Sequence, residues 1–120
     1  MLTKNDFRLR LDDQIVGYER ISGNYTLFST NLFQWNGKFI DHNHKDRCTS
    51  FQDKNNNWIF DQDIIRSTDY PQNTFTVTYD HLLTKFLLVE TNDEVIFEHS
   101  IELVCNDKRK VSRITFGFIN

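Results

Sequence analysis

The feature of this sequence that most constrains its fold is an alternation of apolar and polar side chains with a period of two residues. It is clearest where Phe75, Val77 and Tyr79 alternate with threonines, and it returns over residues 7–11 and 113–118. Successive side chains of a β-strand point to opposite faces, so this period predicts strands rather than helices. The chain contains no alanine, the best helix former, but eleven phenylalanines and eleven threonines, which favour pleated surfaces. The sequence therefore predicts a mainly β protein.

Turn-forming residues divide the chain into short segments. Asn36-Gly37 lies between two apolar flanks and predicts a hairpin, while the polar stretch 41–57 is predicted to be the longest loop. Residues 95–104 fit a strand or a single helix, and the pattern leaves that choice open. We expect one domain over residues 1–120, of class β or α+β, forming a small SH3-like barrel or antiparallel sheet domain built from hairpins with at most one helix. Its strands are predicted at residues 7–11, 14–21, 25–30, 58–60, 64–65, 74–79, 85–90 and 113–118.

The composition narrows the class of protein. The chain has 120 residues, of which 26% are charged, and a net charge of −3, which is typical of a soluble globular domain. No apolar run approaches the roughly 20 residues of a membrane helix, and the first residues carry charges in place of an apolar leader segment. Cys48 and Cys105 lack a paired spacing, so free thiols in a reducing compartment are expected. These features predict a cytoplasmic protein without a membrane partner.

One segment carries side chains of the kinds that bind metals. If the chain is extended there, His42, His44, Asp46 and Cys48 project from one face, and imidazole, carboxylate and thiolate are all zinc ligands. No second cluster complements them, so a solvated polar loop is the preferred interpretation. Residues 53–57 begin like a calcium loop, but the glycine and the final glutamate of such a loop are missing. No metal is therefore predicted, and these four residues are the candidates if one binds.

The sequence offers no arrangement of residues suited to catalysis. Asp61 and Asp63, with Asp53, form a set of carboxylates, but solvent-facing turn residues explain them better than acid–base chemistry. His99 falls on the apolar face of its segment, where a packed histidine is expected. Neither a serine nucleophile motif nor a glycine-rich phosphate loop is present. We therefore expect a protein that is not an enzyme and that uses no cofactor.

A small basic cluster lies near the C-terminal end of the sequence. It comprises Lys108, Arg109, Lys110 and Arg113. Combined with exposed aromatic side chains such as those of Tyr70 or Trp35, such a cluster is typical of a face that binds single-stranded nucleic acid. The acidic net charge argues against this interpretation, and a basic turn that protects a sheet edge is the simpler one.

The segment 49–65 reads TSFQDKNNNWIFDQDII. It resembles the signature T-G-L-x-D-K-N-G-K-x-I-[YF]-E-G-D-I-V of the YopX family of phage and prophage proteins. Segments 15–18 and 114–120 are similar to the first and last motifs of that family. The three glycines of the signature are replaced here by Ser50, Asn56 and Gln62. The residues that match the signature are Thr49, Asp53, Lys54, Asn55, Ile59, Phe60, Asp63 and Ile64.

The resemblance implies a small phage-encoded protein that forms homo-oligomers, and the family supplies no catalytic residues to assign. We therefore expect a non-enzymatic phage or prophage protein that binds or inhibits a host or phage protein in the bacterial cytoplasm. Two alternatives stay open. One is a small nucleic-acid-binding β-barrel that uses the basic cluster at residues 108–113, and the other is a metal-dependent enzyme that uses the 41–48 loop.

Overall fold

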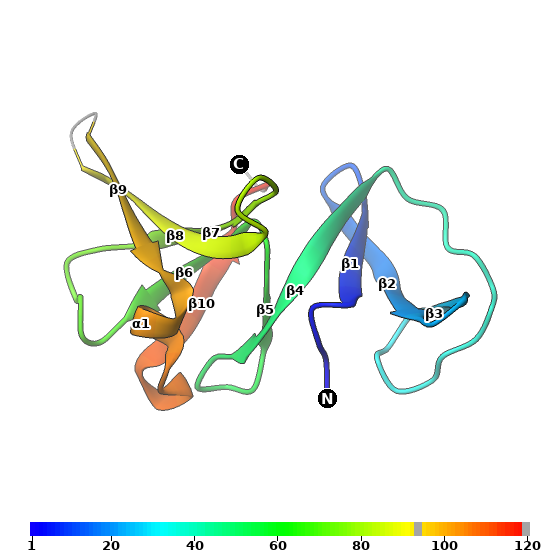
Figure 1. The fold of residues 1–120 in the computed structure, drawn as a ribbon. Coiled ribbons are helices and arrows are strands. Elements are labelled where there is room, and N and C mark those ends of the chain that lie inside the picture. The colour runs from blue at the N-terminus through cyan, green and yellow to red at the C-terminus, as the bar shows by residue number, and fades with distance from the viewer. Residues whose placement is uncertain (93–94, 119–120) are drawn as a thin grey trace.

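The chain folds into two antiparallel sheets, seen side by side in the computed structural model (Figure 1). The structure describes residues 1–92 and 95–118, and within them each sheet has five strands. The same residues contain one α-helix, α1 (Ile101–Cys105), and one 3-10 turn, η1 (Lys108–Lys110). The predicted fold class, mainly β and antiparallel with at most one α-helix, is confirmed. Neither described helix has the length or the apolar character needed to cross a membrane.

The first sheet has the strand order β3-β2-β1-β4-β5. Two-residue turns join its first three strands, as the predicted hairpins require. Gly17 lies where β2 approaches the following segment: a Cβ there would be 2.6 Å from Ile40 Cδ1 and 2.8 Å from the Ser29 carbonyl oxygen. The close approach expected of a glycine inside a strand is thus present. The strands are β1 (Asp6–Leu11), β2 (Gln14–Ser22), β3 (Tyr25–Ser29), β4 (His44–Gln52) and β5 (Trp58–Phe60).

The second sheet has the order β10-β6-β7-β8-β9 and holds the larger apolar core. Phe75 and Val77 of β7 are fully buried, because the alternation with threonine directs every second side chain inward. Ile101 and Val104 of α1 pack into the same core. The strands are β6 (Asp63–Ser67), β7 (Phe75–Asp80), β8 (Lys85–Asn92), β9 (Val95–Ser100) and β10 (Val111–Phe116).

The prediction of a long loop over residues 41–57 is wrong. Nine of these residues form β4, which pairs with β1 in the middle of the first sheet. The segment is polar because its strand carries Asp46 into a buried ion network, where arginines of β1 replace the apolar neighbours that a buried strand usually has. Hydrophobic periodicity does not detect a strand of this kind.

The predicted hairpin at Asn36-Gly37 is also wrong. The only strand-like pairing in this region is an isolated bridge between Phe28 and Asn36, within the part of the chain that the structure describes. The Asn31 carboxamide oxygen accepts hydrogen bonds from the backbone N–H groups of Phe33 and Gln34. This side-chain turn folds the chain back before Asn36-Gly37 is reached, which removes the need for a second turn.

The choice left open at residues 95–104 resolves into both alternatives in succession. A strand continues to Ser100, and the helix α1 begins at Ile101. Ser100 has an extended backbone, and its hydroxyl donates to the Glu102 carboxylate at 2.6 Å. The change from strand to helix brings Ile101, Val104 and Cys105 onto the core of the second sheet.

Candidate functional site

The first part of the candidate site is the connection between β4 and β5, which contains the centre of the 49–65 segment. Asp53 is completely buried there. Its carboxylate accepts hydrogen bonds from the backbone N–H groups of Asn55 and Asn57 at 2.9 Å, and from that of Arg113 on β10 at 3.0 Å. Burial works to raise the pKa of Asp53, but these hydrogen bonds outweigh it and hold the pKa below its ordinary value. Asp53 thus ties the turn to the edge of the second sheet.

Thr49 supports the same connection from the end of β4. Its buried hydroxyl donates to the Ile59 carbonyl oxygen at 2.7 Å and accepts from the Phe51 N–H at 3.1 Å. Ile59 and Phe60 fill the two apolar cores on either side of β5. These matching residues of the signature therefore perform structural tasks, and they expose no reactive group.

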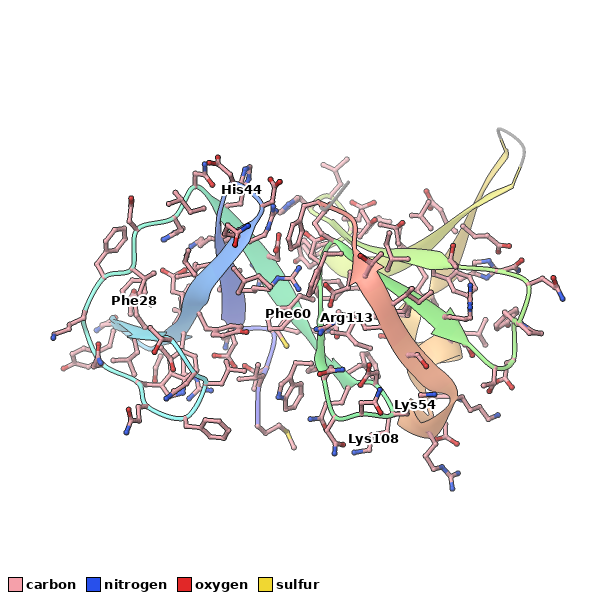
Figure 2. The ribbon with its side chains drawn as sticks, turned by 180° about the vertical axis from the view of Figure 1, so that it is seen from behind. Phe28, His44, Lys54, Phe60, Lys108 and Arg113 are labelled. Atoms are coloured by element: carbon pink, nitrogen blue, oxygen red, sulfur yellow. The ribbon has the colours of Figure 1, made fainter. Side chains whose placement is uncertain are left out.

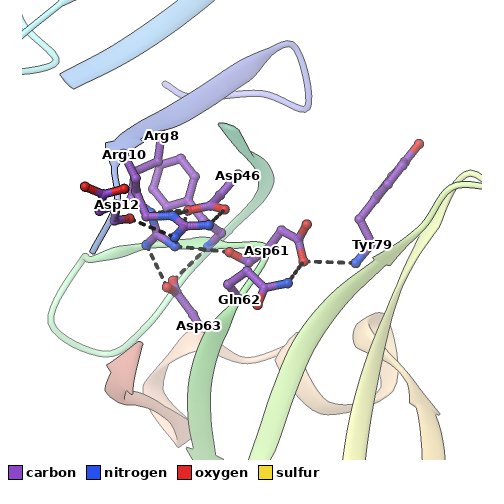
Figure 3. A network of polar contacts seen from close by, with 9 residues as sticks. Arg8, Arg10, Asp12, Asp46, Asp61, Gln62, Asp63 and Tyr79 are labelled. Carbon is purple, nitrogen blue, oxygen red and sulfur yellow. Dashed lines mark hydrogen bonds and ion pairs between the residues drawn. The ribbon is translucent and has the colours of Figure 1, made fainter. Parts of the chain in front are cut away.

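The second part is a buried ion network between the two sheets (Figure 3). Arg8 of β1, only 1% exposed, lies 2.9 Å from the Asp46 carboxylate of β4 and 2.7 Å from the Asp63 carboxylate of β6. It also donates to the Asp61 carbonyl oxygen at 3.1 Å. Arg8 therefore connects the first sheet, the β5–β6 turn and the second sheet with one side chain.

A second arginine completes the network. Arg10 donates to both oxygens of the Asp46 carboxylate, at 2.7 and 2.9 Å. The Arg8 guanidinium also lies over the rings of Phe60 and Phe116, at 4.9 and 5.0 Å from their centres. Two guanidinium and two carboxylate groups thus balance one another inside a partly aromatic shell, which is the condition under which buried charges are tolerated.

The electrostatics of the network follow from its burial. Burial raises the pKa of Asp63 above its ordinary value, against the opposing effect of the Arg8 guanidinium. No buried side-chain nitrogen or oxygen atom of the described residues is left without a hydrogen-bond partner. Asp61 and Asp63 are therefore not the solvent-facing turn residues that the sequence suggested, since Asp63 is fully buried and Asp61 half-buried. The buried polar atoms of the network are thus all engaged in holding the two sheets together.

The four candidate metal ligands do not share one open site. Cys48 is fully buried, and burial raises the pKa of its thiol to about 12. Asp46 is engaged by the two arginines, and the His42 ring is bonded to the Ile40 carbonyl oxygen at 2.7 Å. His44 is exposed at the start of β4. Within residues 1–92 and 95–118 no three histidine, cysteine or acidic side chains gather in a way that could hold an ion.

The predicted basic cluster separates into different surroundings. Arg109 pairs with Asp107 at 2.9 Å, and the Arg113 guanidinium lies over the Phe116 ring. Lys108 donates to the Asn56 side-chain oxygen at 2.7 Å. Figure 2 shows Lys54 and Lys108 at the same edge of the molecule, near the β4–β5 turn.

Lys110 instead joins two basic side chains that the sequence analysis did not assign to the basic cluster. Together with Lys54 and Arg66 it lines a cleft of about 330 Å³, here called the basic cleft. Lys110 lies 3.2 Å from Asp69, whereas no carboxylate of the described residues forms an ion pair with Lys54 or Arg66. The remaining lining residues are Ser67, Thr68, Pro71, Ser112 and Ile114.

A second cleft, of about 500 Å³, lies between the segment that follows β3 and the start of β5. We call it the aromatic cleft, because Phe33, Trp35 and Trp58 line it. The Arg20 guanidinium lies 4.1 Å from the centre of the Trp35 ring. The other lining residues are Met1, Leu2, Asn31, Leu32 and Asn56.

A third cleft, of about 280 Å³, borders β3 and is called the β3 cleft. Phe28 and Phe39 form its apolar wall, with their ring centres 5.5 Å apart, and Ile40 lies beside them. Phe39 is 67% exposed, and Tyr25 at the start of β3 is 75% exposed. This end of the molecule therefore presents large apolar side chains to solvent.

Two kinds of site residue escaped the sequence analysis. Arg8 and Arg10 occupy the polar positions of the alternation over residues 7–11, yet both are buried. Lys54 and Arg66 lie too far apart in the sequence to suggest one cleft. The signal that could have revealed Arg8 is the polar strand that contains Asp46, because a buried arginine needs a carboxylate partner in a neighbouring strand. The pairing of Lys54 with Arg66 depends on the fold alone.

The comparisons with known proteins assign this chain to no group. No family model matches it, and neither a curated protein nor a solved structure does.

Proposed function

We propose that this protein is a small non-enzymatic phage- or prophage-type module that binds, and thereby inhibits or redirects, a host or phage protein in the bacterial cytoplasm. The observation that carries the proposal is the apolar wall of the β3 cleft, and Figure 1 shows β3 at one end of the molecule. Phe39 is mostly exposed there and packs against Phe28 with the ring centres 5.5 Å apart, and Ile40 lies beside them. Exposed apolar side chains that line a surface cleft are typical of protein interaction sites.

The phage origin rests on the resemblance to the YopX family. The backbone supports it at the three positions where the family signature has glycine. Ser50, Asn56 and Gln62 have φ angles of 68°, 63° and 78°, a region that glycine occupies far more readily than other residues. A signature glycine at each of these positions fits the same backbone without strain.

The test is affinity capture from lysate of a phage-infected bacterium, with Phe39→Glu as the matched variant. The proposal predicts a defined partner that the original protein retains and that Phe39→Glu loses, because a charge at the β3 cleft opposes apolar docking. Lys85→Glu, on the far sheet, serves as the control for a change of charge alone. The proposal is contradicted if Phe39→Glu captures the same proteins as the original protein and Lys85→Glu. It is also contradicted if the original protein captures no partner. Native mass spectrometry of the same sample measures the proposed homo-oligomer.

A second function, nucleic-acid binding, is favoured by one specific observation. The basic cleft brings Lys54, Arg66 and Lys110 together although they come from three separate segments of the chain. Convergent cations next to hydroxyl groups are suited to phosphate oxygens. This second candidate predicts salt-dependent binding to oligonucleotides, since each phosphate contact releases counterions.

A further inference from the structure

The β4–β5 turn stands between the basic cleft and the aromatic cleft. Lys54 lines the first, and Asn56 lines the second. Two residues of chain span at most about 7 Å, so the two clefts adjoin at this turn. Lys108 lies at their boundary, where its ammonium group donates to the Asn56 side chain at 2.7 Å. Both clefts therefore border the same turn, the basic cleft at Lys54 and the aromatic cleft at Asn56.

The aromatic end offers flat faces to solvent. The Phe33 side chain is 88% exposed. Trp35 and Trp58 are half-buried and rest on the smaller apolar core, which fixes their rings while part of each remains open to the cleft. Arg20 adds a planar cation against Trp35. Fixed aromatic rings beside an arginine are suited to stacking planar ligand groups.

The cationic end has little opposing charge. Asp53, which precedes Lys54 in the sequence, points inward and is fully buried against backbone N–H groups. Among the described residues, only Asp69 pairs with a cation of the basic cleft, and that pair is half-exposed on both sides. The local charge of this end is thus positive although the whole chain carries −3. Ser112 and Thr68 add hydroxyl groups to the lining.

We propose that the two clefts together bind single-stranded nucleic acid, with backbone phosphates in the basic cleft and bases stacked in the aromatic cleft. The proposal rests on the second candidate function and specifies its ligand. A cationic groove beside aromatic platforms is the general means by which proteins hold single strands. A duplex keeps its base faces stacked inside, and a free phosphate leaves the aromatic end without a role. A proline-rich peptide suits the aromatic end but gains nothing from the cations.

The test is fluorescence anisotropy with a labelled oligothymidylate of about twelve nucleotides, titrated at several salt concentrations. The original protein is expected to bind at low salt and to weaken as salt rises. Lys54→Ala with Arg66→Ala should reduce the slope of log K against log salt by about 1.4, because each lost phosphate contact contributes about 0.7. Phe33→Ala should weaken binding about fivefold or more, because a base loses its stacking partner.

Two matched controls separate this surface from general effects. Lys85→Ala removes an exposed lysine, and Leu82→Ala an exposed apolar side chain, both at the turn between β7 and β8 and outside the two clefts. Both controls should bind like the original protein, and circular dichroism should show all variants folded. Equal losses in controls and surface variants overturn the proposal.

The outcomes also separate the proposal from the function on which it rests. If neither the single-stranded oligonucleotide nor a duplex binds at low salt, the proposal and the nucleic-acid-binding function both fail. If a duplex of the same length binds equally well and Phe33→Ala changes nothing, nucleic-acid binding stands and the single-strand surface is wrong. If a proline-rich peptide displaces the oligonucleotide completely at equal concentration, the aromatic cleft belongs to a protein ligand and the proposal is overturned.

Discussion

Asp53 illustrates how much of this structure depends on individual carboxylates. One buried side chain organises the β4–β5 turn and holds the edge strand β10 through the Arg113 N–H. Because the N–H donors favour the charged carboxylate, its pKa in the folded protein lies below that in the unfolded chain. The stabilisation is therefore present above the ordinary aspartate pKa and is lost as the pH falls through the lower folded value.

This linkage gives the first prediction. Asp53→Asn should lower the free energy of unfolding at pH 7 by about 2 kcal/mol or more, since charge-assisted hydrogen bonds are lost at a buried site. The difference between variant and original should shrink as the pH falls below about 4, where the carboxylate loses its charge in the unfolded chain first. Urea unfolding over a pH series measures it. A difference that stays constant with pH contradicts the assignment.

The cysteines give a second prediction at this scale. Cys48 and Cys105 are both buried, and burial raises the pKa of each thiol to about 12. Since the thiolate is the reactive form, neither should react with a thiol reagent at pH 8 in the folded protein. Two equivalents should react once the protein is unfolded in urea. Rapid reaction of one equivalent in the folded state would show that a thiol is accessible.

The sequence predicts those features of the fold that depend on local patterns and misses those that depend on distant contacts. The strand at residues 75–80 can be predicted from the sequence because every second side chain is apolar and faces the buried side of the sheet. β4 could not be predicted because Asp46 obtains its partners from β1, more than thirty residues earlier in the chain. No local sequence pattern indicates such a pairing. The clefts depend on contacts of the same long range. Sequence reasoning therefore recovers the fold class and most strands, but not the ion network or the surfaces that the folded chain assembles.

At the scale of an element, three places in the chain share a backbone feature: a bend near the end of β4, the β4–β5 turn and the β5–β6 turn. Ser50, Asn56 and Gln62 all have positive φ. This conformation costs a residue with a Cβ atom roughly 1–2 kcal/mol, whereas glycine adopts it freely but orders at a larger loss of entropy. The exposed Ser50 is the cleanest place to measure the balance.

The third prediction follows from that balance. Ser50→Gly should raise the free energy of unfolding by about 0.5 kcal/mol, because relief of strain exceeds the added entropy of glycine. Ser50→Val should lower it, since a β-branched residue is strongly disfavoured at positive φ. The control is Ser112→Gly on β10, where the same change in an extended strand should be destabilising. Thermal unfolding of the three variants measures the signs, and a loss for Ser50→Gly contradicts the argument.

At the scale of the whole molecule, the two sheets form a body of 44 × 27 × 26 Å. The connections between them include the short β5–β6 turn, the network around Arg8 and the hydrogen bonds from the β4–β5 turn to β10. The β5–β6 turn is braced where Gly117 donates to the Gln62 carbonyl oxygen at 2.6 Å and where Asp61 accepts from the Tyr79 N–H at 3.2 Å. The network holds the same junction from the side of β1, so loss of Arg8 affects both sheets.

The fourth prediction tests the network. Arg8→Met should lower the free energy of unfolding by about 3–5 kcal/mol, because it leaves buried carboxylates without their counter-charge. Arg109→Ala is the matched control: its ion pair with Asp107 has the same 2.9 Å length as that between Arg8 and Asp46, but its side chain is 86% exposed. The control should change stability by less than about 1 kcal/mol. Equal effects of the two substitutions in urea titrations contradict the proposed role of Arg8.

The ion network also has a consequence for the order in which the chain reaches its final form. Arg8 bonds to Asp46 and Asp63, which lie 38 and 55 positions further along the chain, whereas the hairpins close over a few residues. Closing a longer loop costs more entropy, so hairpins form early and distant ion pairs late. During synthesis Arg8 leaves the ribosome long before Asp63 exists. We therefore expect the arginines of the N-terminal hairpin to stay hydrated until their partner aspartates have been made, and the pair between Arg8 and Asp63 is the ion pair of this network that joins the two sheets.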